Sequence, residues 1–269
     1  MHRLIVTSQT YQLASAPHDA EWSAAETEQA RVAFAHSSTA DPRNRRWWRR
    51  NRLRLDGESI RDSLLAAGDQ LSTRRGGPGV RPPLPPVITV TLLKDQWNPS
   101  GDAEDHRRRS IYLFVRRNLR YPLFDVFDRP DTNATCPLRH ESTTATQSLV
   151  LLNSALSLDA ARHLAGVVLS SAPDDRAAQV AQAYRRVFAR APDADELQSA
   201  LDFLERQTAQ LQAAGREPAS LALPVLPRGS QRDSLSPDSL PPNIDPHNAA
   251  ALVDFCLALL NSSEAVCVD

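Results

Sequence analysis

Apolar and polar residues alternate at helical spacing through the second half of the chain. From Thr144 onward, apolar side chains recur three and four positions apart, which predicts four helices joined by short links. The residues with this spacing are Leu149, Leu152, Leu158, Ala161, Leu164, Val168, Val180, Ala183, Tyr184, Val187, Leu197, Leu201, Leu204 and Leu211. Asp159, Asp174 and Asp193 stand near the expected starts of the last three helices, where a carboxylate favours the positive helix end.

The first half of the chain has a weaker pattern. Residues 41–71 place Pro42 where a first helical turn would start and continue with a broken helical spacing, which predicts one or two helices. Residues 74–86 combine glycines and prolines and form a connector. Residues 87–93 and 110–115 are β-branched and aromatic runs that predict a small antiparallel pair of strands, with a short buried helix as the alternative for the second run.

A proline- and serine-rich stretch precedes the last apolar segment. Residues 216–246 are too polar and too rich in proline to form a packed core, so we expect a linker that is disordered or lies along the surface. Residues 247–269 begin with an apolar helix that must dock on the main body, residues 1–215, to bury its face. The expected fold is mainly α: an irregular helical domain with a minor two-stranded β element and a docked C-terminal helix.

Composition narrows the choice of partners. The 269 residues are 41% apolar and 23% charged, as in ordinary globular proteins, and the net charge of -1 provides no global attraction for polyanions. No apolar run approaches the ~20 residues of a membrane span. The apolar core at residues 4–6 is too short for a signal peptide, so the chain as written is expected in the cytoplasm. No C-x-x-C or C-x-x-C-H motif for zinc or haem occurs.

Arginines are concentrated in residues 43–54, which contain seven of them and two adjacent tryptophans. Cations that meet phosphate and indoles that stack on bases would suit a nucleic acid. The alternative is a set of arginines that lie over the core or pair with Asp56, Glu58 and Asp62. We favour the second interpretation, and expect no nucleic-acid partner, because no nucleic-acid-binding motif accompanies the arginines.

Carboxylates are concentrated farther along, within residues 106–154. Asp125, Asp128, Asp131 and Asn133 follow a D-x-x-D-x-x-D-x-N pattern. Such a group suits calcium, which takes about six to eight oxygen ligands, but the spacing is not that of an EF-hand. The alternative is a network of ion pairs, which we favour because acidic and basic side chains nearly match in number. The arginines available for it are Arg116, Arg117, Arg120 and Arg129.

The same segment contains the candidate catalytic residues. Asp128, Asp131, Arg139 and His140 would surround a cleft if the chain were an enzyme. Cys136 and His140 are close in sequence and suggest a thiol nucleophile with a base. A lone cysteine before a proline is more often a buried small side chain or half of a disulfide, so we lean against catalysis.

Four hydroxyl residues precede the first of the expected C-terminal helices: Ser142, Thr143, Thr144 and Thr146. One of them is expected to cap that helix, with Gln147 closing a capping box onto Thr144. Free N–H groups at the helix start would alternatively hold an anion such as sulfate or carboxylate. The candidate binding residues are therefore Arg116, Arg117, Asn133, Thr143, Thr144 and Gln147.

Several blocks of the sequence resemble the planctomycete PSD-one domain of unknown function, in the family's order. They are HRLIVTSQTY, NRLRLDGESIRDSLLA, GGPGVRPPLPP, RRSIYLFVRRNLRYPLF, FDRPDTNATCPLRHESTTATQSLVLLNS, AYRRVFARAPDADELQSALDFL and CLALLNSSEAVCVD. The resemblance implies a C-terminal module of large exported proteins, preceded by a cytochrome c-type domain and an uncharacterised domain. Haem would lie on those upstream domains, with no cofactor in this chain. Because Met1 falls inside the family's pattern, we expect a truncated member.

Two cysteines coincide with positions where the resembled family tends to have cysteine. They are Cys136 and Cys256, whereas Cys267 stands where an aromatic residue is expected. An exported family makes a bridge between Cys136 and Cys256 a hypothesis, provided that the C-terminal helix docks beside the loop that contains Cys136. Two separate buried thiols are the alternative.

Two functions remain in competition. A non-catalytic binding or scaffolding module of an exported, cytochrome-linked protein is favoured, since no catalytic triad, metal motif or nucleotide loop is recognisable. The alternative is a hydrolase acting on a polyanionic or polysaccharide substrate, with the candidates above and Asn133 around a cleft. Side chains that converge on an open pocket would favour the enzyme, and side chains that pair with one another would favour the binding module.

Overall fold

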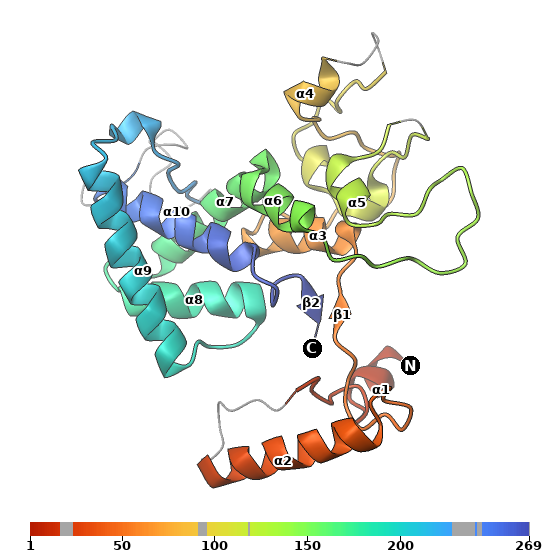
Figure 1. Cartoon of the computed structure of the whole chain (residues 1–269). Helices are drawn as coiled ribbons and strands as arrows, with labels where there is room; N and C mark the ends of the chain where they lie inside the picture. The colour runs from red at the N-terminus through yellow and green to blue at the C-terminus, as the bar shows by residue number, and fades with distance from the viewer. Residues whose placement is uncertain (17–23, 91–95, 118, 228–239, 241–243, 269) are drawn as a thin grey trace. The chain divides into compact units, whose positions relative to one another are not determined.

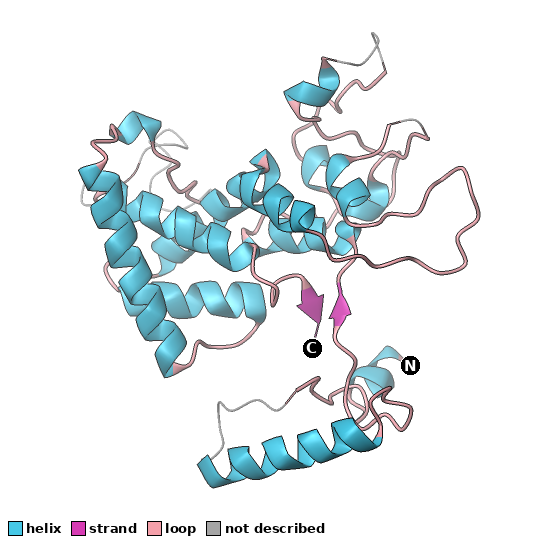
Figure 2. Cartoon of the chain, viewed as in Figure 1, coloured by secondary structure: helices cyan, strands magenta, loops and turns pink. Residues whose placement is uncertain are grey.

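The computed structural model describes residues 1–16, 24–90, 96–117, 119–227, 240 and 244–268. Within these residues the fold is mainly α with one two-stranded antiparallel sheet, as expected (Figures 1 and 2). The chain divides into two compact units. One contains residues 1–55 and 267–269, and the other contains residues 56–266.

The sheet lies in the smaller unit and pairs a segment of the first quarter of the chain with one at its C-terminus. Strand β1 (Leu53–Arg54) pairs with β2 (Cys267–Val268), with Leu53 opposite Val268 and Arg54 opposite Cys267. The prediction of strands at residues 87–93 and 110–115 was therefore wrong in place. Prolines at the start turn Pro86–Thr89 into the short helix α4, and residues 91–93 lie outside the described part of the chain.

The second predicted strand begins as a 3-10 helix, η2 (Ser110–Tyr112). Ser110 is buried there, whereas Ile111 is 77% exposed, so burial does not follow the apolar residues of the run. Leu113 then makes an isolated parallel bridge with Val80. The alternative of a short helix was the better interpretation of this run.

Two helices of the smaller unit lack a sequence signal. Helix α1 (His2–Val6) has no buried residue, and α2 (Ala24–Ala40) has few apolar side chains, of which Val32 is 60% exposed. The ring of Phe34 in α2 instead packs edge-on against Trp48, with centroids 5.0 Å apart. A single aromatic contact from within a helix leaves no periodic stripe in the sequence.

The predicted helices between residues 41 and 71 reduce to one. Residues 41–52 are irregular, with Asn44 and Trp47 at positive φ, and the buried Asn44 side chain donates to the Arg49 carbonyl at 2.7 Å. Helix α3 (Gly57–Ala67) begins only at the Asp56 cap, whose Oδ1 accepts the Ser59 N–H at 2.8 Å. Local turn bonds thus replace the first predicted helical turns.

The larger unit contains the strongly periodic helices. They are α5 (Pro122–Val126), α6 (Ala145–Asn153), α7 (Ala155–Ser171), α8 (Arg176–Phe188), α9 (Ala194–Ala213) and α10 (Pro246–Leu260). The four predicted between residues 144 and 213 are confirmed. Asp193 caps α9 as expected, but Ser154 caps α7 in place of Asp159, and Asp175 caps α8 in place of Asp174.

Helix α10 lies against α7 and α9 in the core of this unit (Figure 1). Its side chains are buried almost all round, and Val253 and Cys256 have no exposed surface. Ala161, Leu164 and Val168 of α7 are likewise fully buried. Alanine-rich surfaces let the two backbones approach closely, which explains why an apolar helix far along the chain completes the core.

One stretch of the expected linker is packed. After the 3-10 helix η3 (Pro218–Ser220), the Val225 N–H donates to the Arg162 carbonyl at 3.0 Å. The Arg162 Nε donates to the Leu223 carbonyl at 2.7 Å, and Pro224 is fully buried. Residues 223–225 therefore pack along α7, where they hydrogen-bond with Arg162 and bury Pro224. Residues 228–239 and 241–243 of the expected linker lie outside the described residues.

Asp254 on α10 offers a test of the packing. Burial raises the pKa of its carboxyl group, and Gln207 Nε2 donates to it at 2.7 Å. A raised pKa stabilises the fold at low pH, and this contribution is lost as the pH rises through the folded-state pKa. Asp254→Asn should therefore increase the free energy of unfolding at pH 7 by about 1 kcal/mol, measured by urea denaturation.

Asp202→Asn provides the matched control, since Asp202 also accepts from a glutamine, Gln198, but is exposed. It should change stability by less than about 0.5 kcal/mol. The gain from Asp254→Asn should also shrink at about pH 3.5, where the carboxyl group is protonated. Equal effects of the two substitutions at pH 7 would contradict the assigned cost of burial.

Candidate functional site

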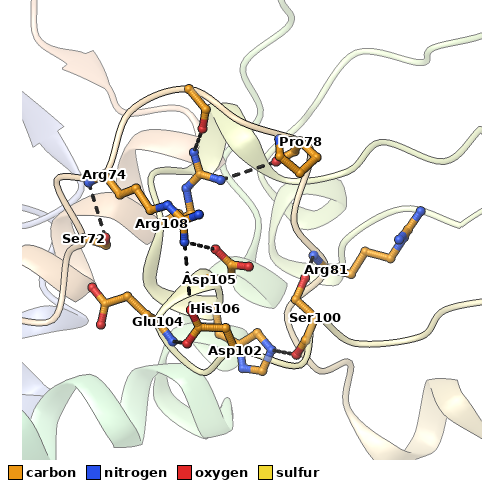
Figure 3. A network of polar contacts seen from close by, with 11 residues as sticks. Ser72, Arg74, Pro78, Arg81, Ser100, Asp102, Glu104, Asp105, His106 and Arg108 are labelled. Carbon is orange, nitrogen blue, oxygen red and sulfur yellow. Dashed lines mark hydrogen bonds and ion pairs between the residues drawn. The ribbon is translucent and has the colours of Figure 1, made fainter.

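Two buried arginines anchor the polar region of the larger unit. Arg61 on α3 and Arg108 are each 1% exposed. Arg61 donates through Nη1 to the Arg108 carbonyl at 2.9 Å and through Nη2 to the His106 carbonyl at 2.6 Å. Arg108 donates to the carbonyls of Gly76 and Pro78 (Figure 3). Backbone carbonyls thus compensate guanidinium groups that would be costly to bury without hydrogen bonds.

An aspartate completes this anchor. Asp62 Oδ1 accepts from the backbone N–H of Ser110 at 2.8 Å and from its hydroxyl at 2.7 Å. The same oxygen lies 3.7 Å from Arg61 Nη1. Asp62 therefore joins α3 and η2, a role that the predicted pairing with the arginines of residues 43–54 did not include.

A framework of hydrogen bonds extends from the anchor into the loops around it. Phe114 N–H donates to the Val80 carbonyl at 2.8 Å, and Val80 N–H donates to the Tyr112 carbonyl at 2.9 Å. The Arg81 N–H donates to Ser100 Oγ at 3.0 Å, and the Ser100 carbonyl lies 2.8 Å from His106 Nε2 (Figure 3). These bonds fix the backbone from which the side chains of Arg81 and Phe114 project.

The predicted ion-pair network forms in part, around Arg120. Its Nη1 lies 2.8 Å from Asp125 Oδ1, and its Nη2 lies 3.2 Å from Asp131 Oδ1. Asn133 donates to Asp131 Oδ1 from its backbone and its side chain, both at 3.0 Å. The backbone N–H of Asn133 lowers the pKa of Asp131, and Arg120 adds to this effect. Asp131 is therefore held as a carboxylate.

The other arginines of the predicted network have different partners. Arg129 Nε lies 3.6 Å from Glu58 Oε1, and Arg116 donates to the Gln96 carbonyl. Arg117 is exposed and makes no ion pair with a described residue. The balance of opposite charges in the sequence was thus a poor guide to the pairing, because Glu58 on α3 competes for the cations.

Asp128 binds a different partner from the other two aspartates of the motif. Its oxygens accept from the Ser142 N–H at 2.8 Å and the Ser142 hydroxyl at 2.7 Å, and its backbone has a φ of +58°. The carboxylate thereby closes the loop of residues 129–141. Within the described part of the chain, no group of three or more histidine, cysteine, aspartate or glutamate side chains has a geometry that could hold a metal ion.

Arg139 connects this loop with the start of α3. Its Nη1 donates to Asp56 Oδ2 at 3.1 Å and to Glu58 Oε2 at 3.0 Å, and its Nη2 donates to Glu58 Oε1 at 3.2 Å. The hydrogen bonds with Glu58 raise the pKa of Arg139. The bidentate geometry is typical of an arginine that joins two segments of a chain.

An open hollow of about 430 Å³ lies beside these pairs. Its lining contains several of the predicted site residues: Asp125, Asp128, Asp131, Cys136 and His140. Arg139 points to α3 instead, and Asn133 binds Asp131. The Cys136 thiol donates to the Leu138 carbonyl at 3.0 Å and shows no hydrogen bond with His140.

The proposed disulfide is absent. Cys136 is an exposed free thiol in the loop, and Cys256 is a free thiol in the core, where burial raises the pKa of its thiol far above the usual range. The alternative of two buried thiols holds for Cys256 alone. Cys256 is buried on α10, so docking of this helix places its thiol in the core, whereas Cys136 lies in an exposed loop.

The residues before α6 have a structural role. Thr144 and Gln147 form the predicted capping box, with Gln147 Oε1 accepting the Thr144 N–H at 3.4 Å. Gln147 is buried, and its Nε2 donates to the carbonyls of Val126 and Ser142 at 3.1 and 3.0 Å. Thr143 is exposed beside it. Gln147 therefore joins α5, the loop and α6.

A second hollow was missed in the sequence. It measures about 230 Å³ and is lined by Arg81, Gln96, Asn98, Phe114 and Arg116. Arg116 was a predicted binding residue, but Arg81, which lies in the proline-rich connector, was not predicted. The signal that was available is the proline that follows it. Pro82 favours extended backbone at Arg81, so the arginine side chain projects from a strand-like segment.

Comparison with known proteins places the chain in a family. The family model described as PSD1, "Protein of unknown function (DUF1553)", matches residues 1–204. The chain belongs to this family. No curated protein and no solved structure matches it significantly. The PSD1 match includes both hollows and the Arg61–Arg108 anchor, whereas α10 and β2 lie beyond the matched residues.

No described helix of this PSD1 member is both long enough and apolar enough to span a membrane.

Proposed function

We propose that this PSD1 member is a non-catalytic binding module of an exported planctomycete protein with a cytochrome c-type domain. The observation that supports it is internal pairing: three of the charged groups expected to do chemistry are engaged by other side chains of this chain. Arg139 is held by Glu58, Asp131 by Asn133 and Arg120, and Asp128 by Ser142. The resemblance of the sequence blocks to PSD-one domains supports the cytochrome-linked setting.

The pairing also weighs against a hydrolase. A general acid or base must reach the substrate with a pKa near the working pH. The Asn133 N–H and Arg120 lower the pKa of Asp131, which makes it a poor acid at neutral pH. Both oxygens of Asp128 are engaged with Ser142. His140 and Cys136 line the same hollow, but no hydrogen bond between them is present to activate the thiol.

The proposed partners are the upstream domains of the family, with polysaccharide as a further ligand. The test is to immobilise this chain and pass over it the cytochrome c-type and uncharacterised domains of a full-length member, expressed as one haem-loaded polypeptide. We expect saturable binding with a Kd of about 10 µM or tighter, measured by surface plasmon resonance. An unrelated c-type cytochrome is the control and should not bind.

The competing activity is measured in parallel. The chain is incubated with neutral and acidic polysaccharides, and released reducing ends are quantified. We expect no release above the buffer blank. Turnover by the wild-type chain that is lost in both Asp131→Asn and His140→Ala would favour the hydrolase over the binding module. Turnover without binding of the haem-loaded domains would have the same meaning.

A further inference from the structure

Two arginines of the larger unit face a hollow without a carboxylate. Arg81 and Arg116 line the 230 Å³ hollow together with Gln96, Asn98 and Phe114. Neither arginine forms an ion pair with a described residue. Five neighbouring arginines each have a carboxylate oxygen between 2.8 and 3.7 Å away: Arg74, Arg109, Arg120, Arg129 and Arg139. Among the described residues, the two guanidinium groups of the hollow therefore carry positive charge that no carboxylate pairs with, unlike those five arginines.

Both guanidinium groups are held in place from the side. The Arg81 guanidinium lies over the ring of Phe114, 4.1 Å from its centroid, and its backbone is bound to Ser100. Figure 3 shows its side chain directed away from the Arg74–Arg108 network. Arg116 donates one hydrogen bond to the Gln96 carbonyl. A guanidinium has five N–H donors, so each retains donors for a ligand.

Trp97 stands between the lining residues Gln96 and Asn98 in the sequence and packs against the ring of Phe114. Trp97 is 8% exposed, and its Nε1 donates to the Pro82 carbonyl at 2.7 Å, directly after Arg81. The rings of Trp97 and Phe114 are 6.4 Å apart. Side chains fixed before binding lose little entropy when a ligand arrives, which favours affinity.

We propose that the hollow lined by Arg81 and Arg116 binds an oxyanion, either carboxylate or sulfate. Paired N–H donors of arginine match two oxygens of a planar carboxylate or of a tetrahedral sulfate, and the ring of Phe114 provides an apolar wall for the atoms next to the charge. The hollow is smaller than the ~300–1,000 Å³ typical of pockets for drug-sized ligands, so it suits one acidic group. This site goes beyond the proposed function and does not depend on association with a haem domain.

The test uses the full chain and isothermal titration with three probes: sodium sulfate, free galacturonate and trigalacturonate. We expect saturable binding of at least one probe at millimolar or lower concentration in low salt. Arg81→Gln and Arg116→Gln should each weaken it about tenfold. Arg117→Gln is the matched control: although the sequence made Arg117 a binding candidate, it is exposed and is not among the residues that line either hollow, so the affinity of this variant should stay within about twofold of wild type.

The variants separate binding from folding. Circular dichroism should show the wild-type melting curve, and Arg81→Lys, which keeps the charge but loses the paired donors, should bind with intermediate affinity. A trimer that binds about tenfold or more tightly than free galacturonate identifies a subsite for an acidic polymer, and equal affinities identify a site for a small acid. No saturable binding of any probe, or equal weakening by Arg117→Gln, would overturn the proposal, whatever the result with the haem domains.

Discussion

Substituting alanine for Gly166 should lower the free energy of unfolding by about 3 kcal/mol, as measured by urea denaturation. A Cβ atom at this position of α7 would lie 1.9 Å from the Val225 carbonyl oxygen and 2.5 Å from its carbon. Backbone cannot rotate away as a side chain can. The segment that contains the buried Pro224 must therefore leave α7 and lose the hydrogen bond between Val225 N–H and the Arg162 carbonyl.

The control for this effect is Gly101→Ala. No heavy atom lies within 4 Å of a Cβ at Gly101, and its φ is not in the left-handed region. The change should be neutral or stabilise by up to about 1 kcal/mol, because alanine restricts the unfolded chain. If Gly166→Ala were as stable as Gly101→Ala, residues 221–227 would not be part of the packed structure.

Arg61→Met should destabilise the chain by about 3–5 kcal/mol in the same assay. Methionine preserves much of the volume of the arginine stem but leaves the buried carbonyls of His106 and Arg108 without their donors. It also removes the cation 3.7 Å from Asp62, which anchors Ser110. The hydrogen-bonded anchor around Arg61 and Arg108 would therefore loosen.

Two further variants distinguish the loss of hydrogen bonds from a general loss of positive charge. Arg75→Met removes an exposed guanidinium nearby and should change stability by less than about 0.5 kcal/mol. Arg61→Lys keeps the charge but cannot reach both carbonyls in the fork geometry, so it should remain clearly destabilised. Near-wild-type stability of Arg61→Met would show that the anchor contributes little.

Periodic patterns in the sequence were enough to predict the helices from residue 144 to 213. Each is long and presents a continuous apolar face, so local spacing and burial agree. The capping box of Thr144 and Gln147 and the Asp193 cap were also predictable, since a cap is a local hydrogen bond between residues two or three apart. The family was recognisable for the same reason, as its blocks follow one another along the chain.

The candidate site depended on residues far apart in sequence. Glu58 pairs with Arg139, which is 81 positions away in the sequence, so Arg139 does not pair with the cluster of aspartates. The buried Arg61 meets the Arg108 carbonyl across 47 positions. No periodicity encodes such pairs, because they arise from the way α3 packs beneath the loops. The assignment of partners to the arginines could not be made from local charge balance.

The chain's sequence by itself determined the mainly α class and the positions of its longest helices, because amphipathic spacing is a property of each segment alone. Only the tertiary structure decided where the strands lie, since β1 and β2 are two-residue segments far apart in the sequence that pair with each other. It likewise decided that Cys136 and Cys256 remain apart and that Arg81 and Arg116 line one hollow. Charge, hydroxyl and thiol groups are assigned their roles by the neighbours that folding brings to them, and those neighbours are mostly distant in sequence.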